Sequence, residues 1–181
     1  MRSFVNIDPA KLPGNPIERI GTDWMLITAG TPERFNTMTA SWGAMGVMWF
    51  KPACFCFIRP QRYTFEFMEQ HEAYTLSFFS GEYRPQLNLC GSRSGREIDK
   101  AAECGFTPRA AENGSVFFDE ARLVIECRKM YFQDLDPKGF LNPAIAECYP
   151  QNDYHRMYIG EITRTAVEKE YLASLLYSEN P

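Results

Sequence analysis

Short apolar runs and alternating apolar and polar positions recur along the chain and predict β-strands. Residues 24–29 and 54–58 are apolar runs, each followed by a Pro-containing stop. Over 73–79, large apolar side chains alternate with smaller ones, as expected for a strand with two different faces. Further strands are predicted at 36–46, 122–132 and 158–163.

Helical patterns are fewer and shorter. One helix is predicted just after Thr64. A second is predicted to begin at Ser94, which has the capping-box spacing to Glu97, and to end at Gly105. A third, amphipathic helix is predicted over about 167–177.

Six or so strands with few helices between them favour an antiparallel barrel with helices packed outside it. A parallel α/β sheet needs a helix between most strands, and the connections here are too short. Gly91 and Gly95 also lack the G-x-G-x-x-G spacing of a dinucleotide-binding turn. The fold class predicted is therefore mainly β.

Composition narrows the class of protein. The 181 residues suit a single domain spanning 1–181, and 45% apolar with 23% charged residues is typical of a folded globular chain. A net charge of -4 excludes a general electrostatic attraction for nucleic acid. The sequence shows neither a signal-peptide core nor a membrane-length apolar run, so we expect a cytoplasmic protein.

The six cysteines do not require disulfides in a domain of this size. Cys54 and Cys56 share one strand and fit disulfide geometry poorly. There is no C-x-x-C pair, and only His71 and His155 could complete a zinc site. We expect buried free thiols and no metal site.

The first candidate binding segment is the hydroxyl-rich stretch 36–42. On a strand, successive side chains point to opposite faces, so four of these seven side chains share one face and three share the other. Small hydroxyls beside main-chain amides can bind the polar edge of a planar heterocycle, but a Thr-rich barrel strand explains the same spacing and is favoured on spacing alone. The one face holds Asn36, Met38, Ala40 and Trp42, and the other Thr37, Thr39 and Ser41.

Two further segments could bind an anion. Arg59-Pro60-Gln61-Arg62-Tyr63-Thr64 lies between a strand and a helix and offers two guanidinium groups. A strand stop with two solvated arginines is an equally good interpretation. Residues 90–96 and Lys100 could form a nest of main-chain N–H groups with added charge, or an ordinary glycine loop.

His155 precedes the last predicted strand, and a lone histidine is more often structural than catalytic. The sequence contains no Ser/His/Asp or Cys/His arrangement and no convincing carboxylate pair. These side chains suit holding a cofactor better than covalent catalysis.

Taken in order, these segments resemble the flavin reductase-like family with the FMN-binding split-barrel fold, in its flavoredoxin-like branch. The matching stretches are 15–16, 23–30, 35–42, 59–64, 89–101 and 153–162. The resemblance implies a six-stranded antiparallel Greek-key split barrel with a few peripheral helices. It also implies a homodimer that holds FMN near the subunit interface.

The resemblance assigns roles to the candidate residues. His155 lies where a nicotinamide would stack on the flavin, as the catalytic candidate. The cofactor-binding candidates are Asn36, Thr37, Met38, Thr39, Ala40, Ser41, Trp42, Arg59, Arg62, Tyr63, Thr64, Cys90, Gly91, Ser92, Ser94, Arg96 and Lys100. Residues 106–118 and 135–152 look particular to this chain and are expected to shape a substrate entrance.

The function expected is that of an NAD(P)H-dependent flavin (FMN) oxidoreductase passing electrons to a second, small-molecule or protein acceptor. An FMN electron carrier without productive nicotinamide binding is the alternative. Two others stay open: a split barrel with another ligand such as haem, and an interaction module without a cofactor.

Overall fold

The computed structural model describes residues 1–178, with side chains up to residue 175. Ten strands and five α-helices are joined by short 3-10 or π turns. The strands are β1 (Phe4–Asn6), β2 (Met25–Thr31), β3 (Arg34–Ala40), β4 (Gly43–Met48), β5 (Lys51–Ile58), β6 (Ala73–Phe78), β7 (Pro108–Ala110), β8 (Val116–Phe118), β9 (Leu123–Asp134) and β10 (Arg156–Glu168). The helices are α1 (Pro16–Glu18), α2 (Tyr63–Gln70), α3 (Arg84–Ser92), α4 (Lys100–Cys104) and α5 (Lys169–Ser178).

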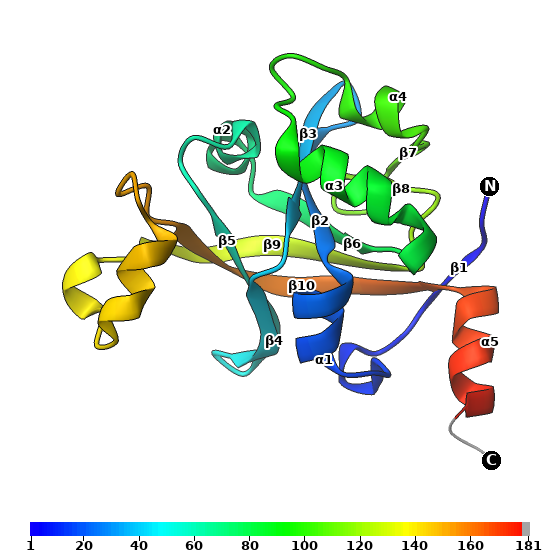
Figure 1. Cartoon of the computed structure of the whole chain (residues 1–181). Helices are drawn as coiled ribbons and strands as arrows, with labels where there is room; N and C mark the ends of the chain where they lie inside the picture. The colour runs from blue at the N-terminus through cyan, green and yellow to red at the C-terminus, as the bar shows by residue number, and fades with distance from the viewer. Residues whose placement is uncertain (179–181) are drawn as a thin grey trace.

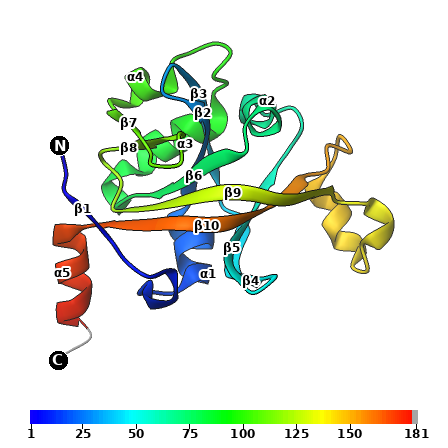
Figure 2. The ribbon, with the colours of Figure 1, turned by 180° about the vertical axis from the view of Figure 1, so that it is seen from behind.

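The main sheet is antiparallel throughout and runs in the order β3-β2-β6-β9-β10-β5-β4, with β1 added beside β10. Figure 1 shows β9 and β10 crossing the whole molecule, with α3, α4 and the small β7–β8 sheet on one side and α1 and β4 on the other. The view from behind shows the same arrangement (Figure 2). The predicted fold, a mainly β Greek-key split barrel with peripheral helices, is confirmed, although the strands outnumber the six expected.

Two apolar clusters hold the fold together. The larger fills the barrel and includes Met25, Tyr74 and Ile125, all fully buried. The second lies between the sheet and the outer layer formed by α3, α4 and β7–β8, and includes Phe118 and Leu87. Burial of large apolar side chains is the main favourable term in folding, so each sheet face is stabilised by its own cluster.

The strand predicted over 36–46 is two strands. β3 ends at Ala40, and β4 begins at Gly43. The break exists because β3 pairs with β2 whereas β4 pairs with β5, at the opposite end of the strand order. Gly43 is needed at this corner, since a Cβ there would lie 2.9 Å from the Phe55 carbonyl oxygen.

The helix predicted from Ser94 begins six residues later. Asp99, not Ser94, caps it, with a carboxylate oxygen accepting from the amides of Ala101 and Ala102 at 3.0 and 3.1 Å. Ser94 instead accepts from the Arg96 amide at 3.2 Å and closes a turn. The prediction was wrong because Gly95 packs directly on Asn36, which fixes residues 94–97 as a loop before helical packing can begin.

Helix α3 was not predicted, and the third predicted helix starts later than expected. α3 begins with Pro85 in its first turn and buries Leu87 and Cys90. The last helix begins at Lys169, because Val167 still pairs with Leu123 in the sheet. No helix in the described residues is long and apolar enough to cross a membrane.

All six cysteines are free, and five of them are buried. The expectation of buried thiols holds except at Cys148, which is exposed.

Candidate functional site

Two neighbouring clefts collect most of the residues singled out in the sequence. The β3 cleft, of about 240 Å³, is lined by Met38, Thr39, Ala40, Ser41, Trp42, Phe57, Arg59, Arg62 and His155. The α4 cleft, of about 430 Å³, is lined by residues that include Asn36, Thr37, Tyr63, Gly95, Arg96 and Lys100. The three predicted segments therefore meet along β3, with the α4 cleft beside its first half and the β3 cleft beside its second.

The two clefts are joined through one main-chain oxygen. Arg62 of the β3 cleft donates to the Cys90 carbonyl at 3.3 Å and to the Gly91 carbonyl at 2.6 Å. Lys100 of the α4 cleft donates to the same Cys90 carbonyl at 2.9 Å and to the Thr37 carbonyl at 2.9 Å. The end of α3 thus holds both cations in place between the clefts.

Neither cation has an anionic partner. Among residues 1–175, no carboxylate forms a salt bridge with Arg62 or Lys100, and Lys100 is 5% exposed. Burial, and then the nearby Arg62 charge, lower the pKa of Lys100 to about 8. Burial likewise lowers the pKa of Arg62. Two partly desolvated positive charges held only by carbonyl oxygens are what a bound anion would relieve.

The other two arginines among the predicted site residues are neutralised within the protein. Arg59 pairs with Asp153 at 2.5 Å and donates to the Cys148 carbonyl at 2.8 Å. Arg96 pairs with Glu66 and lies over the Tyr63 ring, 4.7 Å from its centroid. These two side chains therefore shape the clefts, whereas Arg62 and Lys100 leave charge available.

Strand β3 has the two faces that its alternation predicts. Met38 and Ala40 point into the barrel core. On the other face, the Thr39 hydroxyl donates to the Leu87 carbonyl of α3 at 2.5 Å, and Thr37 shares a 2.9 Å hydrogen bond with Thr28. The threonine hydroxyls thus fix β3 to its neighbours.

Asn36 and Thr64 form a buried pair beside the α4 cleft. The Asn36 amide donates to the Thr64 hydroxyl at 2.7 Å, and Thr64 is fully buried. A Cβ at position 95 would overlap the Asn36 side chain and displace its hydrogen-bonded amide. Thr64 supports the cleft from behind, and Asn36 with Gly95 forms part of its wall.

The sequence predicted that residues 90–96 run into the start of a helix. The structure shows that they do not. Cys90, Gly91 and Ser92 are the last residues of α3, and the carbonyl groups of Cys90 and Gly91, rather than N–H groups, face the cations. The Ser92 hydroxyl donates back to the Asn88 carbonyl at 2.8 Å. The Cys90 thiol points away toward Cys104, with 3.7 Å between the sulfur atoms.

Burial, together with Cys104, raises the pKa of the Cys90 thiol to about 12, so the thiol stays protonated. Its part in the site is therefore the main-chain carbonyl.

His155 forms the side of the β3 cleft facing Trp42. The two ring centroids lie 4.9 Å apart, and His155 is 8% exposed. Burial, followed by the Arg59 charge, lowers the pKa of His155 to about 4, although Asp153 acts in the opposite direction. The imidazole is therefore neutral near pH 7.

Tyr149 is a site residue that sequence reasoning missed. Its hydroxyl lies 2.9 Å from Nδ1 of His155, and its ring packs edge-on against Trp42. It belongs to the segment 135–152, which includes η4 (Pro137–Gly139) and η5 (Pro143–Cys148) and projects from one end of the barrel (Figure 1). The aromatic group Tyr149, Tyr154 and His155 in one stretch was the available signal.

The two segments that look particular to this chain have different places in the structure. Residues 135–152 reach the β3 cleft through Tyr149 and the Cys148 carbonyl, as expected for an entrance. Residues 106–118 instead form the β7–β8 hairpin over the second apolar cluster, where Phe118 is fully buried. The entrance prediction is wrong for the latter, because its aromatic residues are core residues.

Comparison with known proteins places the chain in a family. Residues 17–180 match the family model of the flavin reductase like domain. A flavoredoxin from Desulfovibrio vulgaris (Miyazaki F) superposes with a TM-score of 0.65 at 23% identity, covering 82% of this chain and 71% of that one. A search of curated protein sequences finds no match.

Two further solved structures share the fold. An FMN-binding domain of a flavin reductases-like enzyme from Shewanella baltica OS155 gives a TM-score of 0.68 at 16% identity, covering 93% of this chain and 79% of that one. An FMN-binding protein from Thermus thermophilus with bound 1-cyclohex-2-enone gives 0.65 at 21% identity, covering 94% and 82%. Since the family model covers almost the whole sequence, the chain belongs to the flavin reductase-like family of split barrels.

Proposed function

We propose that this protein binds FMN, with the flavin ring in the β3 cleft and the phosphate at Arg62 and Lys100. The single observation that carries the proposal is a pair of cations, buried Lys100 and half-buried Arg62, that meet at the Cys90 carbonyl and have no carboxylate partner within residues 1–175. A phosphate monoester would supply the missing negative charge and accept their remaining N–H groups. Structural relatives described as FMN-binding support the choice of cofactor.

The residues present fit FMN. Ser41 and Trp42 lie at the mouth of the β3 cleft, where Trp42 is 44% exposed and offers an aromatic edge. Thr39 and the main chain at the end of β3 supply the polar wall. When bound, FMN supplies the ability to accept a hydride and to release electrons one or two at a time. The protein contributes orientation and the exclusion of water.

His155 is proposed to form the surface against which a nicotinamide ring lies. Its neutral imidazole adds no positive charge to a position where the nicotinamide becomes cationic as hydride leaves. In this proposal the Tyr149 hydroxyl donates to Nδ1 and holds the imidazole ring in one orientation.

The activity proposed is transfer of electrons from NAD(P)H through FMN to a second acceptor. The Thermus thermophilus FMN-binding protein was solved with 1-cyclohex-2-enone and with p-hydroxybenzaldehyde, which supports a small-molecule acceptor. The alternative is an FMN electron carrier, supported by the similarity to flavoredoxin. The carrier would have the same cation pair but would not react with a nicotinamide.

One absorption experiment tests both steps. Purified protein, incubated with FMN and passed over a desalting column, should retain a flavin spectrum, whereas Arg62→Gln should lose it. Anaerobic addition of NADH or NADPH should then bleach the bound flavin. A wild-type protein that retains no FMN contradicts the binding proposal. Flavin that is retained but not bleached by either nucleotide supports the carrier.

A homodimer is proposed through the tip of the β4–β5 hairpin. Trp49 and Phe50 at this tip both have positive φ values, 50° and 62°, a conformation that is costly for bulky residues. Phe50 is fully exposed there, and Val47 is 74% exposed. A turn that keeps two strained aromatics in solvent is better explained as an interface than as a free surface.

Sedimentation equilibrium tests the dimer. Phe50→Asp should shift the protein to a monomer, because a carboxylate at the centre of an interface would be desolvated. Leu141→Asp is the matched control, since Leu141 is 97% exposed but lies in the segment 135–152. A wild-type protein that sediments as a monomer contradicts the proposal.

A further inference from the structure

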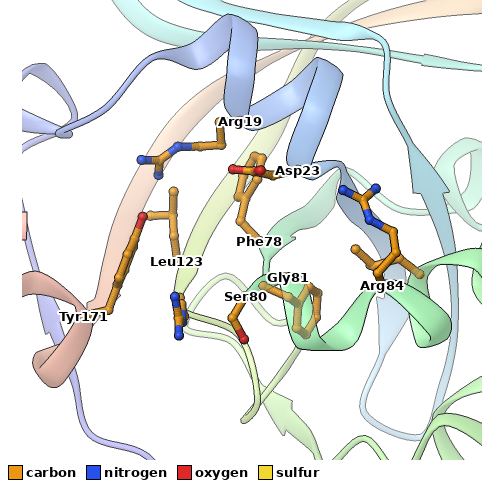
Figure 3. Close-up of a pocket in the computed structure, with 11 residues that line it drawn as sticks. Arg19, Asp23, Phe78, Ser80, Gly81, Arg84, Leu123 and Tyr171 are labelled. Carbon is orange, nitrogen blue, oxygen red and sulfur yellow. The ribbon is translucent and has the colours of Figure 1, made fainter. Parts of the chain in front are cut away.

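A third cavity lies at the other end of β10 from His155. It has a volume of about 220 Å³, and we call it the arginine pocket (Figure 3). Its wall comes from the turn η2 (Arg19–Asp23), the ends of β6 and β9, the turn η3 (Gly81–Tyr83), α3 and α5. It shares no lining residue with the β3 or α4 cleft.

Arg19 is the most deeply buried charge of the pocket. It is only 8% exposed, and Nη2 donates to the Pro13 carbonyl at 2.6 Å. Its guanidinium lies 5.9 Å from the Phe78 ring centroid. Among residues 1–175, no carboxylate forms a salt bridge with it. A buried, unpaired guanidinium is costly, so its retention needs a reason.

Two more arginines line the same cavity without an anionic partner in the described side chains. Arg84 donates once, to the Thr22 carbonyl at 2.5 Å, and lies over the Trp24 ring at 4.1 Å. Arg122 lies over the Tyr171 ring at 5.2 Å and makes no side-chain hydrogen bond within residues 1–175. Three guanidinium groups carry about fifteen N–H donors. Only two side-chain hydrogen bonds use them here.

The net charge at the pocket is positive although the chain as a whole is at -4. Asp23 is the only acidic residue in the lining, and its carboxylate points into the same space as Arg19 in Figure 3. It is exposed and forms no salt bridge with the three arginines. Three positive charges against one negative charge leave an excess of two, which matches a dianion.

Four of the seven other lining residues are apolar. Leu123 is fully buried, and Leu87, Phe78 and Phe79 are each less than 8% exposed. The volume equals that of about seven liquid waters. That is enough for a phosphoryl group and a small attached body, but not for a second flavin nucleotide.

We propose that the arginine pocket is a binding site for a small phosphate monoester with a compact apolar body, distinct from the flavin site. The guanidinium groups come from three separate places in the fold: η2, α3 and the bend just before β9. A tetrahedral phosphoryl group presents three oxygens to donors from several directions, whereas a flat carboxylate presents two. The apolar wall formed by Phe78, Phe79 and Leu123 contacts the body of the ligand.

Titration calorimetry with phenyl phosphate as the probe tests the proposal, with inorganic phosphate as the comparison. Wild-type protein saturated with FMN should bind one phenyl phosphate per chain and bind it more tightly than inorganic phosphate. Arg122→Gln should weaken binding about tenfold, because it removes a charge-assisted donor. Asp23→Asn should tighten binding several-fold, because it removes the one repelling carboxylate.

Arg62→Gln is the matched control, since it removes an unpaired cation from the flavin site instead. It should leave the phenyl phosphate affinity of the arginine pocket unchanged. A thermal melt confirms that each variant is folded. Asp23→Asn, at an exposed position, tests whether the charge of the pocket sets its affinity for phosphate without removing an arginine. The proposal is overturned if phenyl phosphate does not saturate at millimolar concentration, if Asp23→Asn and Arg122→Gln both leave its affinity unchanged, or if Arg62→Gln abolishes binding.

Discussion

Both ends of the barrel hold cations that have no carboxylate partner among the described side chains, but they hold them differently. At the β3 and α4 clefts, Arg62 and Lys100 are fixed by main-chain carbonyls at the end of a helix. At the arginine pocket, Arg84 and Arg122 lie on aromatic rings, and only Arg19 and Arg84 donate to a main-chain carbonyl, once each. Carbonyl support sets the position of a charge within a fraction of an ångström, whereas aromatic support sets only its plane.

This difference indicates what each end selects. A cofactor that must present one ring atom to a second substrate needs fixed anchors. A site that only retains a small anion can use guanidinium groups that adjust to it. The experiments below separate the two ends, from the largest expected effect to the smallest.

Removal of the Lys100 charge should reduce FMN affinity at the β3 and α4 clefts more than any other change. Lys100→Met is expected to weaken FMN binding about 100-fold, because the phosphate loses a desolvated cation. The flavin-free protein should be no less stable than wild type, since an unpaired charge leaves the interior. Fluorescence titration with FMN and a thermal melt measure both effects.

Arg93→Gln provides the matched control. Arg93 lies next to Ser94, is exposed and faces only Glu97 at 3.9 Å. Its loss should change FMN affinity less than twofold. Retention of wild-type FMN affinity by Lys100→Met would contradict the phosphate assignment.

Acid should destabilise the His155 side of the flavin end. The pKa of His155 is about 4 in the folded chain and 6.5 in the unfolded chain, so below pH 6.5 the unfolded state binds the extra proton. The free energy of unfolding should therefore fall by about 2 kcal/mol from pH 6.5 to pH 5.

Urea unfolding at a series of pH values measures this effect. His155→Gln should lose that part of the pH dependence. If the free energy of unfolding of this variant falls with pH as steeply as that of wild type, other groups cause the effect.

Alkali should weaken FMN binding through Lys100. Because its pKa is about 8 in the flavin-free protein, the side chain loses its charge above that pH. The dissociation constant of FMN should rise by roughly tenfold for each pH unit above 8, as one proton is lost. Lys100→Arg, which stays charged, should flatten this dependence, and an unchanged profile in that variant would contradict it.

The smallest effect is expected at Tyr149. Tyr149→Phe removes the hydroxyl beside Nδ1 of His155 and should cost about 1 kcal/mol of stability. If the hydroxyl orients the ring, the rate of flavin reduction by NAD(P)H should fall while FMN affinity stays unchanged. Stopped-flow mixing measures the rate, and equal losses in rate and FMN affinity would indicate a structural role alone.

Local patterns predicted most of the sheet, because alternation and apolar runs depend only on neighbouring residues. The cap at Asp99 was missed, since the capping-box spacing at Ser94 looked equally good and only the contact between Gly95 and Asn36 excludes it. Whether a segment forms one strand or two, as at the Ala40–Gly43 corner, depends on which partner each half meets in the sheet.

The candidate site was partly predictable for a related reason. Several polar residues close together in the sequence predicted the segments that line the β3 and α4 clefts. Tyr149 lies in a loop without periodicity, and nothing local relates it to His155 except closeness in the chain. The arginine pocket joins Arg19, Arg84 and Arg122, which are far apart in the sequence and come together only through packing.

The strained tip at Trp49 and Phe50 also limits how this chain can vary in length. β4 and β5 are joined by these two residues alone, so the turn contains no spare position. One inserted residue would slide β4 against β5 and turn Met45 away from the barrel core that it contacts. Insertions and deletions should therefore be tolerated in the turns η4 and η5, ahead of Cys148, and rejected at this hairpin.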